Sequence, residues 1–179
     1  MSGLEVDKTT HAINVIAYAH HEAHGGSAYV ISQRTAVNEF DIAAPMTFYI
    51  TTPDTTKWPH LTITGEANTA AYWELFEDNG NTDNFNVTGG DSVTAMNRNR
   101  NSSKTSGLTI TTGATVTQAT SDVLIETEAL GKSGGSGERH EFILKQNTKY
   151  LVRSTSYADN NEGSFTIDWY EHTNKAQIT

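Results

Sequence analysis

The chain of 179 residues contains no cysteine, and this absence removes several kinds of chemistry at once. Disulfide bonds, zinc sites built from thiolates and cysteine nucleophiles are all excluded. Long hydrophobic runs are missing too, since no apolar stretch approaches the roughly 20 residues that a helix needs to cross a bilayer. The N-terminal segment has neither a basic cluster nor an apolar core, so we expect no signal peptide and no membrane partner.

Positive charge is also scarce. The 12 Lys and Arg residues are outnumbered by 21 Asp and Glu residues, which gives a formal net charge of -9 at pH 7. A surface this acidic repels phosphate backbones unless it carries a local basic patch. We therefore expect no nucleic-acid partner.

The chain is rich in Thr, Asn, Ser and Gly, and short alternating apolar runs end in clusters of turn residues. Thr favours half-buried strands, whereas Asn, Ser and Gly favour turns. The expected strands cover residues 11–19, 27–32, 46–51, 60–64, 70–77, 107–112, 121–130, 140–146, 149–156 and 164–173. About ten strands at this spacing predict a single all-β domain with a β-sandwich or jelly-roll fold.

Alternation within the strands predicts which side chains form the core. Phe165, Ile167 and Trp169 share one face of their strand. Both faces are partly apolar between Trp73 and Phe76, so we expect that strand to be central or to lie under a partner. The turn KQNTK (145–149) reads as a hairpin.

Two segments lack an apolar pattern. Residues 1–10 are expected to form an N-terminal arm that precedes the β-sandwich domain of residues 11–179. The segment NRNRNSSKTS (97–106) has no apolar side chain and is locally basic. Neither segment can offset its ordering entropy by burial, so each is expected to be mobile or held by something outside the domain. An acidic protein surface suits the second segment better than nucleic acid, because it has no aromatic residue for base stacking.

The stretch AYAHHEAHGGS (17–27) is the most conspicuous cluster of titratable residues. Its spacing is one residue short of the zinc-protease pattern, which also requires a helix. We interpret it as a strand end that runs into a glycine turn. On a strand, His20, Glu22 and His24 point the same way at intervals of about 7 Å, which is too far for chelation without a bulge or a second strand. We expect a polar cluster between subunits and no metal site; a metal-dependent hydrolase is the alternative.

Other motifs carry no chemistry in this context. Residues 130–137 (LGKSGGSG) contain Gly-Lys-Ser, but the earlier glycine of a phosphate-binding loop is absent and a strand follows. Residues 78–84 (DNGNTDN) are rich in oxygen ligands without the register of a calcium loop. We therefore expect no enzymatic activity and no cofactor.

Several sequence segments, taken together, resemble a group of small virion proteins of tailed bacteriophages. They are AHHEAHGGSAYVIS, FYITTPDTTKWPHLT, NRNSS, EFILKQNTKYLVR and DWYEHT, which span roughly residues 18 to 173. The resemblance implies a structural protein of the particle, most plausibly a decoration (cement) protein.

On this resemblance the chain binds the major capsid protein on the capsid exterior of the virion, after a period in the host cytoplasm during assembly. Further copies of the chain are also expected partners. A trimer is the expected oligomer, because capsids offer threefold positions. The candidate capsid contacts are Leu4, Val6, Arg98, Arg100 and Lys104.

The alternative function is a carbohydrate-binding module of a phage tail or receptor-binding structure. β-Sandwiches often bind sugars through exposed aromatic side chains. The candidate platform consists of Trp58, Tyr72, Trp73 and Tyr170.

Overall fold

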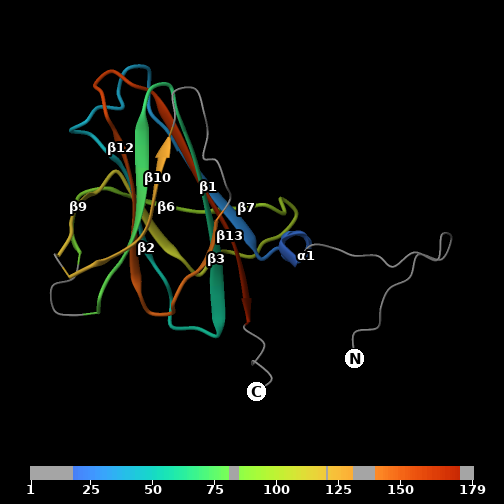
Figure 1. The fold of residues 1–179 in the computed structure, drawn as a ribbon. Coiled ribbons are helices and arrows are strands. Elements are labelled where there is room, and N and C mark those ends of the chain that lie inside the picture. The colour runs from blue at the N-terminus through green and yellow to red at the C-terminus, as the bar shows by residue number, and fades with distance from the viewer. Residues whose placement is uncertain (1–17, 81–84, 120, 131–139, 174–179) are drawn as a thin grey trace, which may run out of the picture.

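Two antiparallel sheets lie face to face in the computed structural model, which describes residues 18–80, 85–119, 121–130 and 140–173 (Figure 1). The five-stranded sheet has the order β11 (Glu141–Ile143), β3 (Lys57–Ala67), β13 (Gly163–Thr173), β1 (Ala28–Arg34) and β7 (Met96–Asn97). The six-stranded sheet has the order β10 (Val123–Leu130), β4 (Ala71–Glu77), β12 (Lys149–Ser156), β2 (Met46–Thr51), β8 (Thr109–Thr112) and β6 (Asp91–Val93). This arrangement confirms the predicted all-β sandwich.

The core lies between the sheets and is built from the inward-facing residue of each alternating pair. Phe165, Ile167 and Trp169 on β13 are buried, as their phase predicts. They pack in one cluster with side chains of the six-stranded sheet, among them Trp73 and Tyr150. Period-two burial of large side chains is what fixes the register of both sheets.

A second, smaller cluster covers the outer face of the six-stranded sheet. The short strands β5 (Asn86–Thr88) and β9 (Thr115–Thr117) pair with each other alone. Val87 and Val116 from this ribbon pack against Phe76 and Leu151. The ribbon explains why β4 is apolar on both faces: it is a central strand, paired with β10 and β12, and it is also covered.

Nine of the ten predicted strands coincide with observed strands, and the first does not. Tyr18 and Ala19 begin the helix α1 (Tyr18–His24), and residues 11–17 lie outside the described residues. The predicted hairpin at 145–149 is also wrong. Asn147 has a left-handed φ of +47°, but the turn joins β11 of one sheet to β12 of the other.

Four short strands, β5, β6, β7 and β9, have no counterpart in the sequence prediction because two or three residues give no periodicity. The expected arm of residues 1–10, with Leu4 and Val6, lies outside the described residues. Within the described ranges, the structure holds no helix with the length and hydropathy of a membrane span.

Candidate interaction surface

The helix α1 is short, and its end is built by two consecutive glycines. The amide of Gly26 donates to the carbonyl of Ala23 (3.1 Å), and the amide of Ser27 donates to the carbonyl of Glu22 (2.9 Å). Gly26 has a φ of +72°. This pair of bonds around a left-handed glycine is the Schellman motif that ends many helices. The glycine pair therefore stops a helix here, where the sequence analysis placed a turn after a strand.

The helix changes the geometry of the histidine cluster. His20 and His24 lie one turn apart on the exposed side of α1, and their Nε2 atoms are 3.0 Å apart. Glu22 does not join them; its carboxylate is half-buried and lies 3.6 Å from Nδ1 of His21. The expected row of three side chains on a strand is thus wrong, because positions two apart on a helix face different directions.

The 97–106 loop is ordered by the domain itself, contrary to the expectation that it is mobile or held by something outside the domain. The buried Asn97 side-chain amide donates to the carbonyls of Gly26 and Lys104, at 2.9 Å each. Its carboxamide oxygen accepts from the amide of Asn99 (2.9 Å). The hydroxyl of Tyr29 donates to the carbonyl of Thr105 (3.0 Å). Buried hydrogen bonds to backbone carbonyls here replace the apolar burial that the loop lacks.

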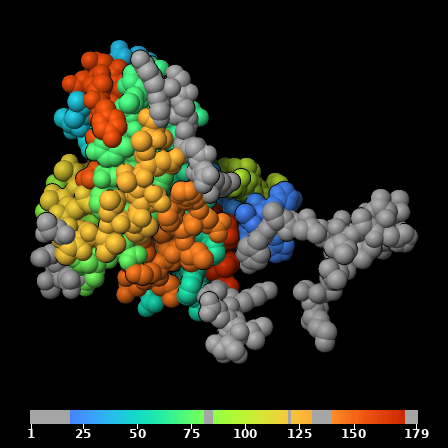
Figure 2. Space-filling view, in the orientation of Figure 1, coloured from blue at the N-terminus to red at the C-terminus, as the bar shows by residue number. Residues whose placement is uncertain are grey.

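The loop also clamps the C-terminal end of α1. The side-chain amide of Asn99 donates to the carbonyl of His24, and the ammonium of Lys104 donates to the carbonyl of Gly25 (2.9 and 2.7 Å). These are the carbonyls that a helix leaves without intrahelical partners, and a cation at that end also complements the helix dipole. In Figure 2 the blue spheres of α1 lie beside the yellow-green spheres of this region. We call α1 and residues 97–106 together the clamp surface.

The three predicted contact cations all lie on the clamp surface and are exposed. Arg98 pairs with Asp168 of β13 at 3.3 Å, and its side chain is 46% exposed. Arg100 has one long contact, at 3.5 Å, to the carbonyl of Asn97. The structure therefore brings Arg98, Arg100 and Lys104 together with His20 and His24, which the sequence analysis had treated as separate sites.

A small pocket of about 200 Å³ adjoins the clamp surface. Its lining includes Ala19 of α1, Arg98 of the loop, and His60, Asp168 and Tyr170 of the five-stranded sheet. A pocket of this size is below the range of typical small-molecule sites. It has room for one side chain of a partner protein.

One wall of the pocket is a hydrogen-bonded trio that the sequence analysis missed. Oε1 of Glu141 lies 2.8 Å from Nδ1 of the buried His60 and accepts the hydroxyl hydrogen of Tyr170 at 3.0 Å. The rings of His60 and Tyr170 are stacked, with centroids 4.5 Å apart. His60 and Glu141 are 81 positions apart in the sequence, so no spacing signal links them.

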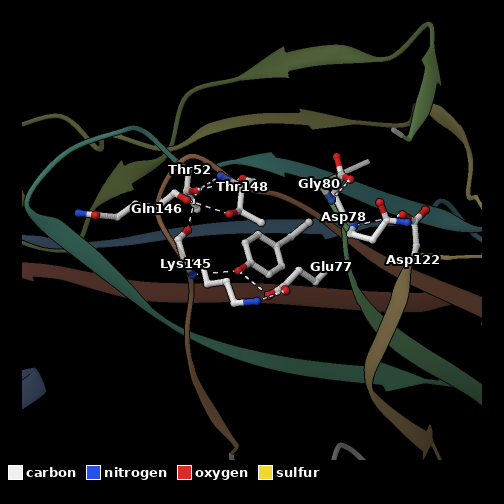
Figure 3. A network of polar contacts seen from close by, with 10 residues as sticks. Thr52, Glu77, Asp78, Gly80, Asp122, Lys145, Gln146 and Thr148 are labelled. Carbon is white, nitrogen blue, oxygen red and sulfur yellow. Dashed lines mark hydrogen bonds and ion pairs between the residues drawn. The ribbon is translucent and has the colours of Figure 1, made fainter. Parts of the chain in front are cut away.

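A second polar network lies at the junction between β4 and the turn that precedes β12 (Figure 3). The hydroxyl of Tyr150 donates to Glu77 (2.9 Å) and accepts from the amide of Lys145 (2.9 Å). Burial, and to a lesser degree the Glu77 carboxylate, raises the pKa of Tyr150 well above its ordinary value, although the Lys145 amide opposes this. Thr52 and Thr148 bridge the adjacent turn. These bonds hold the connection between the sheets.

The four aromatic residues of the carbohydrate alternative do not share one face. Trp73 is a core residue with 1% exposure, and its indole donates to Glu128 (3.1 Å). Tyr72 lies on the six-stranded sheet beside Tyr157, whereas Trp58 and Tyr170 lie on the five-stranded sheet. Trp58 borders an open groove of about 470 Å³, together with Asp54, Thr55, Thr56, Gln146 and Thr173.

Metal ligands are not gathered in threes: among the described residues, no group of three or more His, Asp or Glu side chains is placed to hold an ion. Residues 81–84 of the oxygen-rich stretch at 78–84 lie outside those residues. No protein-family model, curated protein or solved structure matches this chain.

Proposed function

We propose that this chain is a structural protein of a tailed-phage particle, which decorates and stabilises the outer surface of the capsid by binding the major capsid protein. The observation that carries the proposal is the clamp surface. It presents three exposed cations from a loop that the domain has already ordered, on a chain with a net charge of -9. The resemblance to small virion proteins of tailed bacteriophages is the reason for proposing a phage capsid as the partner.

Pre-ordering matters for docking because a loop that is already fixed loses little conformational entropy on binding. The bonds from Asn97, Asn99 and Lys104 fix the loop before any partner arrives. A cationic patch on an acidic body also orients the molecule, because an acidic partner surface attracts the patch and repels the acidic remainder of the chain. The adjoining pocket offers a place for one partner side chain.

The test is co-sedimentation of the purified chain with capsids of its own phage from which the protein has been stripped or deleted. Wild-type protein should saturate at a fixed number of copies and raise the temperature at which the capsids open. Arg100→Glu should bind more weakly, because it reverses a charge whose one hydrogen bond among the described residues is long. Arg34→Glu is the matched control: its side chain is 73% exposed, on β1 beside Glu162 and away from the clamp surface.

Failure of wild-type protein to bind capsids, or deletion particles that resist heat and low ionic strength as well as complete ones, would reject the decoration role. Equal binding of capsids by Arg100→Glu and Arg34→Glu would be compatible with the decoration role but would mean that the capsid contact lies on another face. Light scattering of the purified chain measures its copy number in solution, where a trimer is the expected result.

A second candidate function is carbohydrate binding at the Trp58 groove. The half-buried indole of Trp58 lines this groove together with Asp54, Gln146 and three threonines, so it offers a stacking surface with hydrogen-bonding residues around it. A glycan array with wild type and Trp58→Ala tests this directly. Binding that disappears in the variant would support the groove, whereas no binding of the wild type at millimolar sugar would dismiss it.

A further inference from the structure

Two imidazole nitrogens converge on the exposed side of α1. Nε2 of His20 and Nε2 of His24 are 3.0 Å apart, and the ring centroids are 4.6 Å apart with the planes nearly perpendicular. Both side chains are exposed, so a ligand can approach from solvent. Which nitrogen carries a hydrogen depends on the tautomers of the two rings.

The backbone beneath these rings is held from both sides. The Schellman bonds at Gly26 and Ser27 fix the end of the helix. The side chains of Asn99 and Lys104 bind the carbonyls of His24 and Gly25. The spacing of one helical turn between the two histidines is therefore set before any ligand binds, which lowers the entropy lost on binding.

We propose that His20 and His24 form a two-ligand site for a divalent transition metal ion of the zinc, nickel and copper class. Imidazole nitrogen suits these ions and coordinates them at about 2.0–2.1 Å. Two such bonds at a right angle place the nitrogens ~2.9 Å apart, and at the tetrahedral angle ~3.3 Å apart. The separation of 3.0 Å in the structure lies within this window. Small side-chain rotations turn both lone pairs toward one ion.

Among the described residues, the neighbouring groups leave the site with two protein ligands. His21 lies about 100° around the helix from His20 and faces Glu22, 3.6 Å away. The Lys104 ammonium at the carbonyl of Gly25 opposes a dication. We therefore expect one ion per chain, with water in the remaining positions and an affinity below that of three-ligand sites. The inference is independent of the proposed function.

The experiment uses the full chain without an affinity tag, treated with chelator and dialysed. Zn²⁺ and Cu²⁺ are titrated separately by calorimetry into wild type, His20→Gln, His24→Gln and His21→Gln. The last is the matched control, since its side chain is 70% exposed on the same helix but points elsewhere. Wild type and His21→Gln should bind one ion. The other two variants should bind about tenfold more weakly or worse, because the second nitrogen then no longer acts at high effective concentration.

Nuclear magnetic resonance adds a reading that does not depend on affinity. Substoichiometric Cu²⁺ should broaden the ring resonances of His20 and His24 first and leave those of the buried His60 sharp. Thermal unfolding of each variant confirms that the fold is intact, as expected for exposed side chains. The proposal is overturned if wild type binds no ion at millimolar metal, if His20→Gln and His24→Gln bind like wild type, or if His21→Gln loses binding equally.

Discussion

Replacement of Gly26 by alanine tests the account of how the clamp surface is built. Gly26 has a φ of +72°, and an alanine in the left-handed region costs about 1–2 kcal/mol. A Cβ atom there would also meet the side chain of Ser102, with its Cβ only 2.7 Å away. Relief of that overlap requires a shift of the loop backbone, and overpacking of this kind costs about 1–3 kcal/mol.

The combined cost is about 2–5 kcal/mol, which for a chain of this size lowers the melting temperature by roughly 2–4 °C per kcal/mol. The loop can escape part of the cost by opening locally, because it contributes no side chain to either apolar cluster. In that case the amides of Arg98 and Ser102, which donate to Ala28 and Asn99, should lose their protection from hydrogen exchange.

Gly25→Ala is the matched control one residue away. A Cβ at Gly25 would meet only the carbonyls of His21 and Glu22, at 3.5 and 3.6 Å, which is ordinary contact. We expect this variant to unfold at the wild-type temperature and to keep its amide protection. If Gly26→Ala behaves like Gly25→Ala in both calorimetry and hydrogen exchange, the loop is not packed on the turn as described.

Three further predictions concern the body of the sandwich. Gly65→Ala should destabilise the fold by about 1–3 kcal/mol in chemical denaturation, because a Cβ there would lie 2.7 Å from Cδ1 of its cross-strand neighbour Phe165; an unchanged midpoint would refute this packing. Glu171→Gln should lower the free energy of unfolding by about 1–3 kcal/mol. The reason is that the buried carboxylate accepts hydrogen bonds from an indole, a hydroxyl and a backbone amide. The same change at the exposed Glu66 should leave the free energy of unfolding unchanged. The pKa of Tyr150 is raised in the folded state, so the stability that its neutral hydroxyl contributes is complete below pH 10 and declines as the pH rises above 10. The free energy of unfolding of Tyr150→Phe should therefore fall less steeply with rising alkaline pH than that of wild type. Equal slopes for the two proteins would contradict the raised pKa.

The strand pattern of this protein could be predicted because burial in a sheet follows a period of two. Phe165, Ile167 and Trp169 alternate with polar residues, and this alternation alone assigns them to the core. The pattern failed at 18–24, where the alanines and histidines give no clear period. There the glycine pair at 25–26 was the usable signal for a helix end, since Gly just past a periodic segment marks a C-terminus.

The candidate site was predicted in part. The basic segment was identified as a contact candidate, and whether it binds a capsid stays a prediction. Its order was predicted wrongly because hydrogen bonds, and not apolar burial, hold the loop. Asn97 reaches Gly26, 71 positions earlier, and no local pattern encodes that bond. The same holds for Asp168, whose partner Arg98 is 70 positions away.

The sequence by itself determined the class of fold and the buried face of most strands, because these depend on neighbouring residues and the geometry of the extended chain. It also ruled out thiol chemistry through composition alone. Only the tertiary structure decided that two histidines meet, that a polar loop is ordered, and that His60 faces Glu141. The two histidines meet because residues 18–24 form a helix and not a strand. The loop and His60 contacts join residues from separate elements, and their positions follow from how the two sheets and α1 pack together.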